Sequence, residues 1–178
     1  MTSRSVLIIS LMPLTPIKCG MQNTIYLLYK YLKKKNFKAF FLEIKTNNFA
    51  DPILNLNYKR SIESKIRKKI DLYKPNLIFV NTSKLLNLYK DLLLDEDRLF
   101  KTILVCHDLY HFRKKFFKQV KLTDKTYLSS IDEIKILKKV NYIIDYSKNE
   151  QIYMRNKNID KRKMLKTCTP TKKFKKVI

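Results

Sequence analysis

The chain has 178 residues, 45% of them hydrophobic, and its 39 Lys and Arg against 15 Asp and Glu give a formal net charge of +24. That length fits one domain and that apolar content can fill a core, which excludes a disordered basic tail. The charge favours polyanionic partners, namely nucleic acid, an anionic membrane face or phosphorylated substrates. An ordinary solvated surface rich in lysine explains it equally well.

The cysteines and the apolar runs bound the cellular setting. Cys19, Cys106 and Cys168 lie far apart and form no C-x-x-C pair, so they indicate neither a disulfide framework nor a zinc site. No run reaches the roughly 18 apolar residues of a membrane span, and the N-terminal stretch lacks the cleavage site of a signal peptide. We therefore expect a cytoplasmic protein.

The chain opens with an apolar segment, a loop and an amphipathic segment. VLIIS at 6–10 is apolar and largely β-branched, the pattern of a parallel strand that is covered on both faces. A loop with Pro13, Pro16 and Gly20 stops it. From Gln22 onward, apolar residues recur at helical spacing and lysines gather at the C-terminal end, where they favour the helix dipole. This order predicts a strand, a loop and a helix.

The same alternation continues to the end of the chain. Two helix starts carry the Ser-x-x-Glu pattern of a capping box, Ser130 with Glu133 and Ser147 with Glu150. Five or six short strands that alternate with helices predict an α/β fold, a Rossmann-like parallel sheet with helices on both faces. The further strands are predicted at 38–44, 76–80, 102–106, from Asn141 and within 163–170. The further helices are predicted at 61–73, from Thr82 or Ser83 to 93, and after Ser130 and Ser147.

Polar residues collect where the predicted strands end. In open α/β sheets, ligands bind beyond the carboxyl ends of the strands, because loops and helix N-termini converge there. His107 is at such an end, and it is either a packing histidine or a ligand contact; His111 fits a loop better. The candidate ends are the loop 10–20, residues 45–48, Asn81 with Thr82, His107 with Asp108, and residues 146–148.

Gly20 is the only glycine of the chain. It stands where the first loop becomes the first helix, so its missing side chain would let the amides of Gly20 and Met21 approach an anion. A turn that needs a positive φ explains it as well. The surrounding residues match neither G-x-G-x-x-G nor a P-loop, so they do not indicate a dinucleotide or triphosphate site.

Several segments, in order, resemble the N-terminal, acceptor-side domain of the family 4-like glycosyltransferases. KPNLIFVNT is similar to the family strand "PD-hydrophobic-V-H-x-H", TILVCHDLY to "V-hydrophobic-T-x-HD", and LSSIDEIKILKKVNYIIDYSKNEQIYM to its E…L…AD…S-x-x-E segment. The resemblance runs from Val6 to Pro170. The departures are the single glycine of the first loop, Asn81 in place of a histidine, and TCTP in place of the usual junction.

The resemblance implies one half of a GT-B architecture, with a glycosyltransferase-like domain over 1–168 and a basic tail over 169–178. In that family a second domain, with an E-x7-E motif, holds the nucleotide sugar. The resemblance also implies that no metal and no cofactor is needed. We therefore expect a hexosyltransferase domain that presents a glycan or lipid-linked acceptor and is inactive as the isolated chain. A separate donor-binding subunit would complete it, and its pathway would be polysaccharide or lipopolysaccharide synthesis.

The resemblance and the strand ends together give the expected site. His107 would hydrogen-bond to the transferred sugar and Asp108 would support it; no residue is assigned as the catalytic base. The expected substrate-binding residues are Gly20, Met21, Asn81 and Ser147.

A basic aromatic segment follows the fourth predicted strand. It is either a solvated loop or a contact for the acceptor or for an anionic inner membrane face, through Phe112, Arg113, Lys114, Lys115, Phe116 and Phe117. Two other functions stay open. Eleven Tyr and ten Phe among the basic residues would suit a nucleic-acid-binding module, although the sequence has no helix-turn-helix, RRM or zinc-finger pattern. A non-catalytic scaffold of a transferase complex is the other.

Overall fold

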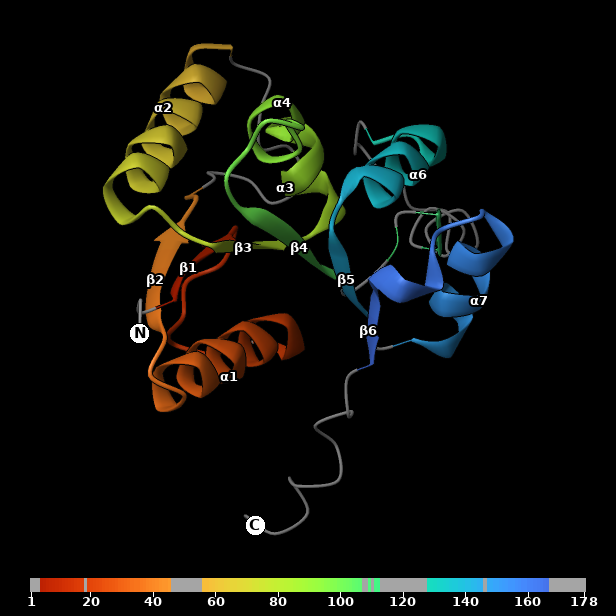
Figure 1. Ribbon diagram of the computed structural model, residues 1–178, viewed down its shortest axis with the longest axis horizontal. Coiled ribbons are helices and arrows are strands. Elements are labelled where there is room, and N and C mark those ends of the chain that lie inside the picture. Colours follow the sequence, from red (N-terminus) through yellow and green to blue (C-terminus); the bar gives the residue numbers. More distant parts are fainter. Residues whose placement is uncertain are drawn as a thin grey trace, which may run out of the picture.

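The computed structural model describes residues 4–17, 19–45, 56–106, 109, 111–112, 128–145 and 147–166. These residues form a six-stranded, all-parallel sheet in the order β2-β1-β3-β4-β5-β6, with helices on both faces (Figure 1). The strands are β1 Ser5–Ser10, β2 Lys38–Glu43, β3 Leu77–Asn81, β4 Lys101–Cys106, β5 Tyr142–Asp145 and β6 Met164–Lys166. The helices are α1 Gly20–Lys34, α2 Leu56–Tyr73, α3 Ser83–Leu88, α4 Lys90–Leu93, α6 Ser130–Lys139 and α7 Lys148–Asn156, with a 3₁₀ turn η1 at Lys161–Lys163.

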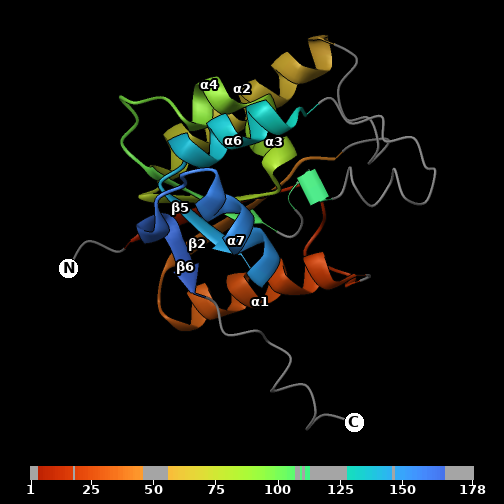
Figure 2. The same ribbon diagram turned by 90° about the vertical axis from the view of Figure 1, so that its right-hand side faces the viewer.

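The direction of the chain across the sheet decides which face each helix covers. From β1 the chain steps to β2 on one side, and it then returns past β1 to β3 and moves steadily to β6. Because crossovers between parallel strands are right-handed, the first crossover helix lies on the face opposite to the later ones. Figures 1 and 2 show α1 below the sheet, and α2, α3, α4 and α6 above it.

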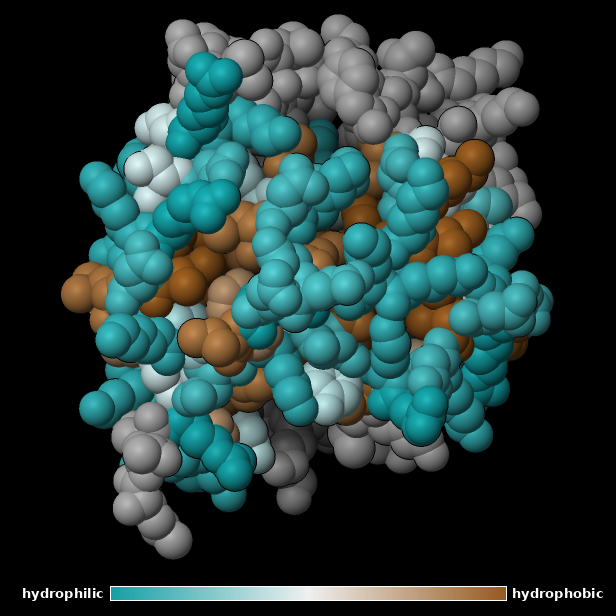
Figure 3. Space-filling view, turned by 45° about the horizontal axis from the view of Figure 1, so that its top comes forward, coloured by the Kyte–Doolittle hydropathy of each residue, from teal (hydrophilic) through white to brown (hydrophobic). Residues whose placement is uncertain are grey.

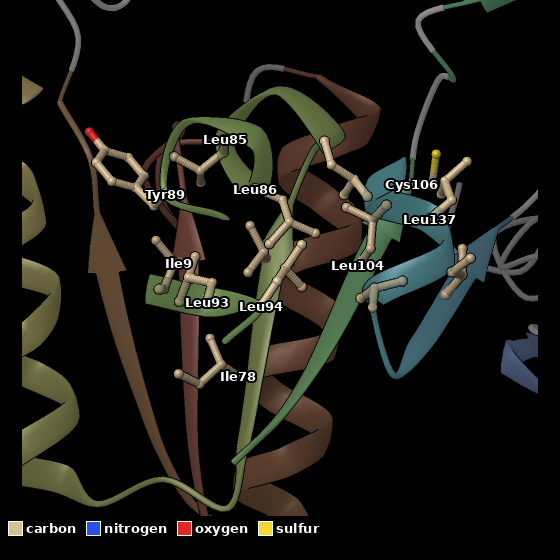
Figure 4. Packing of buried hydrophobic residues seen from close by; sticks show 14 of the residues in the cluster. Ile9, Ile78, Leu85, Leu86, Tyr89, Leu93, Leu94, Leu104, Cys106 and Leu137 are labelled. Atoms are coloured by element: carbon tan, nitrogen blue, oxygen red, sulfur yellow. The ribbon is translucent and has the colours of Figure 1, made fainter. Parts of the chain in front are cut away.

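Each face of the sheet has its own apolar core, since side chains alternate along a strand. Leu7 and Ile9 of β1 belong to the core under α2, α3 and α6, whereas Val6 and Ile8 belong to the core under α1. Figure 4 shows the first core from close by, with leucines of α3 and α4 packed on Ile9, Ile78 and Leu104. All six residues of β1 are buried, which explains why the sequence predicts a strand covered on both faces.

The outer surface over α2, α3, α4 and α6 is largely hydrophilic, with apolar side chains visible between the polar ones (Figure 3). Among the described residues, no helix is both long enough and apolar enough to cross a membrane. The α/β, Rossmann-like fold class that the sequence predicts is confirmed, as are the six strand positions.

Two local predictions need correction. Ser129, rather than Ser130, is the N-cap of α6, and its hydroxyl accepts from the Asp132 amide at 3.0 Å. The helix expected after Thr82 divides at Tyr89 into α3 and α4. Thr82, one of the two starts expected for this helix, is the N-cap of α3, because its hydroxyl accepts from the Leu85 amide.

Candidate functional site

The carboxyl ends of all six strands lie at one edge of the sheet, because every pairing is parallel. β1 and β3 are neighbours, although β2 comes between them in the sequence. The chain leaves β1 in one direction and β3 in the other, so this edge has a topological switch point between β1 and β3. Such points are where open α/β sheets bind ligands.

A polar pair occupies this switch point. Ser10, the last residue of β1, and Asn81, the last residue of β3, are both 0% exposed. Asn81 Nδ2 donates to Ser10 Oγ at 3.1 Å, and Ser10 Oγ also accepts from the Met12 amide at 3.0 Å. Among the described residues, Asn81 Oδ1 has no hydrogen-bond partner. Because a buried polar atom without a partner costs stability, this acceptor is a natural contact for a ligand hydroxyl.

The backbone next to Asn81 is strained. Thr82 has φ 91° and ψ 140°, in a region that a β-branched residue rarely adopts. Such conformations cost on the order of 1–3 kcal/mol and cluster at functional sites. The strained residue caps α3 with its hydroxyl, so the strand end, its turn and the start of the helix are held together.

The loop after β1 is tied to α1 by a glutamine that sequence reasoning did not single out. Gln22 is 4% exposed, and its Nε2 donates to the carbonyl oxygens of Pro13 and Pro16 at 3.2 and 3.1 Å. The loop includes a cis peptide bond between Thr15 and Pro16. Gln22 thus fixes where the loop from the switch point enters α1. Its position at the start of the apolar stripe of α1 is the sequence feature from which its burial could have been predicted.

Gly20 is the first residue of α1 and is exposed, and Met21 after it is half-buried. The interpretation that Gly20 serves a turn with positive φ is wrong, because its φ is not positive. A Cβ added at Gly20 would meet nothing within 4 Å. The α1 N-terminus has no side-chain cap at Cys19 and no acidic residue in its first turn. Its amides therefore suit an anionic group, and that role of Gly20 and Met21 stays a prediction.

Two buried carboxylates hold the segment that follows β4. Glu150 of α7 accepts from the Leu109 amide at 2.5 Å, and Glu133 of α6 accepts from the His111 amide at 3.2 Å. Both are at most 5% exposed. The sequence predicts these two glutamates as halves of local capping boxes, but their side chains bind the backbone of another segment. His107 and Asp108, the expected catalytic pair, lie outside the described residues.

Aromatic contacts also hold the segment that follows β4. The His111 ring stacks on Tyr153 of α7 at 4.3 Å between centroids, and Phe112 meets Tyr153 edge-on at 5.5 Å. Burial, and to a lesser extent the charge of Glu133, raise the pKa of Tyr153 above its ordinary value. Phe112 packs against the core under the α2 side of the sheet. Arg113, Lys114, Lys115, Phe116 and Phe117 lie outside the described residues.

Ser147 is at the same edge as Asn81, but it follows β5, and β4 lies between β5 and the strand that ends at Asn81. Its hydroxyl caps α7 by accepting from the Glu150 amide at 3.4 Å. Its own amide donates to Asp145 Oδ1 at 3.1 Å. The hydroxyl therefore has a structural task, and a contact between Ser147 and substrate stays a prediction.

One hollow is lined mainly by residues of the helices rather than by the strand ends. A groove of about 640 Å³ runs between α4 and α6, and its lining includes Asn87, Asp91 and Lys135. In the part of the chain that the structure describes, no group of three His, Cys, Asp or Glu side chains could hold a metal ion. The switch point is thus the candidate site that rests on an unpartnered buried group.

Comparison with known proteins supports the fold. No family model matches the sequence, and neither does any curated protein. Among solved structures, the chain is similar to sucrose-phosphate synthase from Thermosynechococcus elongatus, with a TM-score of 0.66 and 16% sequence identity. The match covers 86% of this chain and 45% of that chain. The chain therefore spans less than half the length of that protein, and the likeness shows a shared Rossmann-like α/β fold.

Proposed function

We propose that this chain is a glycosyltransferase-type domain that presents a sugar acceptor at the carboxyl edge of its sheet. Its fold is similar to part of a sucrose-phosphate synthase, and the order of its sequence motifs resembles the acceptor-side domain of family 4-like glycosyltransferases. The observation that carries the proposal is Asn81 Oδ1, a buried acceptor without a partner among the described residues, at the switch point of the sheet.

In this proposal the acceptor hydroxyl donates to Asn81 Oδ1, while Ser10 fixes the orientation of the carboxamide through Nδ2. An anionic part of the acceptor or donor would lie against the uncapped amides of Gly20 and Met21 at the α1 N-terminus. His107 would contact the transferred sugar, with Asp108 in support. A nucleotide sugar would bind only with a second domain or a separate donor-binding subunit.

Two asparagines of the chain offer a matched pair of variants for the test. Asn81→Leu removes the carboxamide at the switch point, whereas Asn87→Leu makes the same chemical change in the groove between α4 and α6. Affinity would be measured by saturation-transfer NMR with a panel of hexoses, disaccharides and hexose phosphates. We expect binding that Asn81→Leu weakens about tenfold, the cost of one lost hydrogen bond in a buried site, and that Asn87→Leu leaves unchanged. No binding by any member, or equal binding to both variants, would contradict an acceptor site at this edge.

The nucleic-acid alternative has less support. Many of the aromatic residues that could stack on bases instead lie in the two cores or at their margins, among them Phe40, Phe79 and Tyr89. Phe40 stacks on Tyr73 with 3.6 Å between ring centroids. These rings have protein partners, so the count of aromatic residues does not measure a base-stacking surface.

A further inference from the structure

Among the described helices, α1 alone covers its face of the sheet (Figures 1 and 2). Ile25 and Leu32 face the sheet and are buried, so the opposite side of α1 faces away from the protein. This outer side differs from an ordinary solvated helix face in two respects, its exposed apolar residues and its charge.

Two large apolar side chains lie next to each other on the outer side of α1. Leu27 and Tyr31 are one helical turn apart, at 37% and 57% exposure, and Ile17 just before the helix is 44% exposed. Lys30 and Lys34 are exposed on the same side. The ammonium group of Lys35 lies 5.9 Å from the ring centroid of Tyr31. We name Ile17, Leu27, Tyr31, Lys30 and Lys34 the α1 surface.

The charges that β1, its loop and α1 carry have one sign. The first acidic residue of the whole sequence is Glu43, so β1, its loop and α1 contribute only basic charge. The helix α2, on the other face, provides a contrast. It is also rich in lysine, but it pairs Arg67 with Glu63 at 2.8 Å, and of its described side chains only Leu72 is a large exposed apolar one.

We propose that the α1 surface docks the protein on an anionic lipid surface. A helix that shows a few apolar side chains between lysines, and no acid, suits the headgroup region, where the apolar groups insert and the ammonium groups stay at the phosphates. Tyr31 can place its ring among the headgroups and keep its hydroxyl in water. Two of the three exposed apolar residues are aliphatic and cannot stack on bases, which favours lipid over single-stranded nucleic acid. The proposal is independent of the sugar-transfer function, and its surface is distinct from the segment 112–117.

The absence of tryptophan from the sequence permits a direct test of insertion. Tyr31→Trp places a single tryptophan on the α1 surface, and Leu72→Trp places one on α2 at a comparable exposure of 67%. The probe is vesicles of phosphatidylcholine with phosphatidylglycerol, and vesicles of phosphatidylcholine alone as the uncharged reference. We expect the emission of Trp at position 31 to shift to the blue on anionic vesicles and to be quenched by brominated acyl chains, with no such change at position 72.

A second pair of variants distinguishes binding through the α1 surface from binding through the overall charge of +24. Lys30→Gln with Lys34→Gln changes α1, and Lys65→Gln with Lys68→Gln removes the same charge from exposed positions of α2. If the protein docks through α1, Lys30→Gln with Lys34→Gln should weaken vesicle binding about tenfold, because both of the lost cations contact the lipid. Lys65→Gln with Lys68→Gln should weaken it less than about fivefold, because those two lysines lie away from the lipid. Leu27→Gln with Tyr31→Gln should weaken the binding that persists when salt screens the charges.

Three results would overturn the proposal. One is an equal loss of binding in the α1 and α2 lysine pairs, and another is the same spectral change at positions 31 and 72. The third is single-stranded DNA that shifts the emission at position 31 while vesicles do not, which would assign the surface to nucleic acid. Because all the altered side chains are exposed or outward-facing, circular dichroism should show unchanged folding in each variant.

Discussion

Glu133 Oε1 accepts a hydrogen bond of 2.8 Å from Ser83 Oγ, and the two buried side chains are 50 residues apart in the sequence. The bond joins α6 to the first residue of α3. The second carboxylate oxygen accepts from the His111 amide at 3.2 Å. One carboxylate therefore connects two helices with the segment after β4, the segment that begins with His107 and Asp108.

Removal of this carboxylate should destabilise the fold strongly. Glu133→Ala leaves the Ser83 hydroxyl and the His111 amide without their acceptor, which should lower the free energy of unfolding by about 2–4 kcal/mol. Glu133→Gln keeps one acceptor and should cost less. Urea denaturation measures both, with Glu63→Ala on α2 as the control, because its exposed ion pair with Arg67 is worth at most about 1 kcal/mol. Equal losses at positions 133 and 63 would contradict the bridging role.

Asn81 should be dispensable for stability. Asn81→Leu has nearly the same shape and loses the Nδ2 bond to Ser10, but it also removes the buried Oδ1 that has no partner among the described residues. These two effects oppose each other, so the free energy of unfolding should change by no more than about 1 kcal/mol. Thr102→Val is the matched comparison. The Thr102 hydroxyl is equally buried and donates to the Leu93 carbonyl at 2.6 Å, so its removal should cost about 1–2 kcal/mol. If Asn81→Leu proves the more damaging of the two, the carboxamide has a structural role and the switch-point site loses its support.

Tyr153 should make the fold sensitive to alkaline pH. Burial and the Glu133 charge raise the pKa of Tyr153 in the folded chain, so the fold favours the neutral phenol. The resulting stability is fully present below the ordinary tyrosine pKa of about 10 and is lost as pH rises through the raised value. Tyr153→Phe should lose less stability between about pH 9 and pH 11 than the unaltered chain does. The measurement is the free energy of unfolding of both chains across that pH range. Parallel pH dependences for Tyr153→Phe and the unaltered chain would contradict the prediction.

Two substitutions at Ser147 distinguish a capping role of its hydroxyl from a contact with substrate. Ser147→Ala should lower the free energy of unfolding by about 0.5–2 kcal/mol, because the Glu150 amide loses its cap. Ser147→Asp restores an N-cap oxygen and should recover that stability. If the hydroxyl also contacts sugar, the saccharide affinity seen in NMR will not recover with the stability. Recovery of both would leave Ser147 with the cap alone.

The strands were predictable because each is a short apolar run that ends in polar residues. Ser5–Ser10 is buried throughout, and the alternation of strand and helix is enough to indicate a parallel sheet. The division between α3 and α4 was not predictable, since Leu85, Leu88, Tyr89 and Leu92 continue one apolar stripe across it. Helix periodicity does not reveal a break at which the chain turns while the stripe stays buried.

The polar contacts between elements could not be predicted either, because sequence patterns indicate local hydrogen bonds only. Glu133 and Glu150 each follow a serine at the spacing of a capping box, a pattern that predicts a local bond. In the fold their carboxylates bind Ser83, Leu109 and His111, because a buried carboxylate needs every nearby donor. Asn81 could be placed at the ligand edge from its position after an apolar run. The unsatisfied state of its Oδ1 required three-dimensional neighbours.

A map of amide chemical shifts tests the central claim most directly. The ¹⁵N-labelled chain would be titrated with the panel of hexoses, disaccharides and hexose phosphates, and separately with UDP- and GDP-hexoses. We predict that members of the panel perturb the amides of Ser10, Met12, Asn81 and the first turn of α1, and that the nucleotide sugars bind no more tightly than the hexose phosphates. Shifts centred on Asn87 and the groove between α4 and α6, or tight binding of a nucleotide sugar by this chain alone, would contradict an acceptor domain.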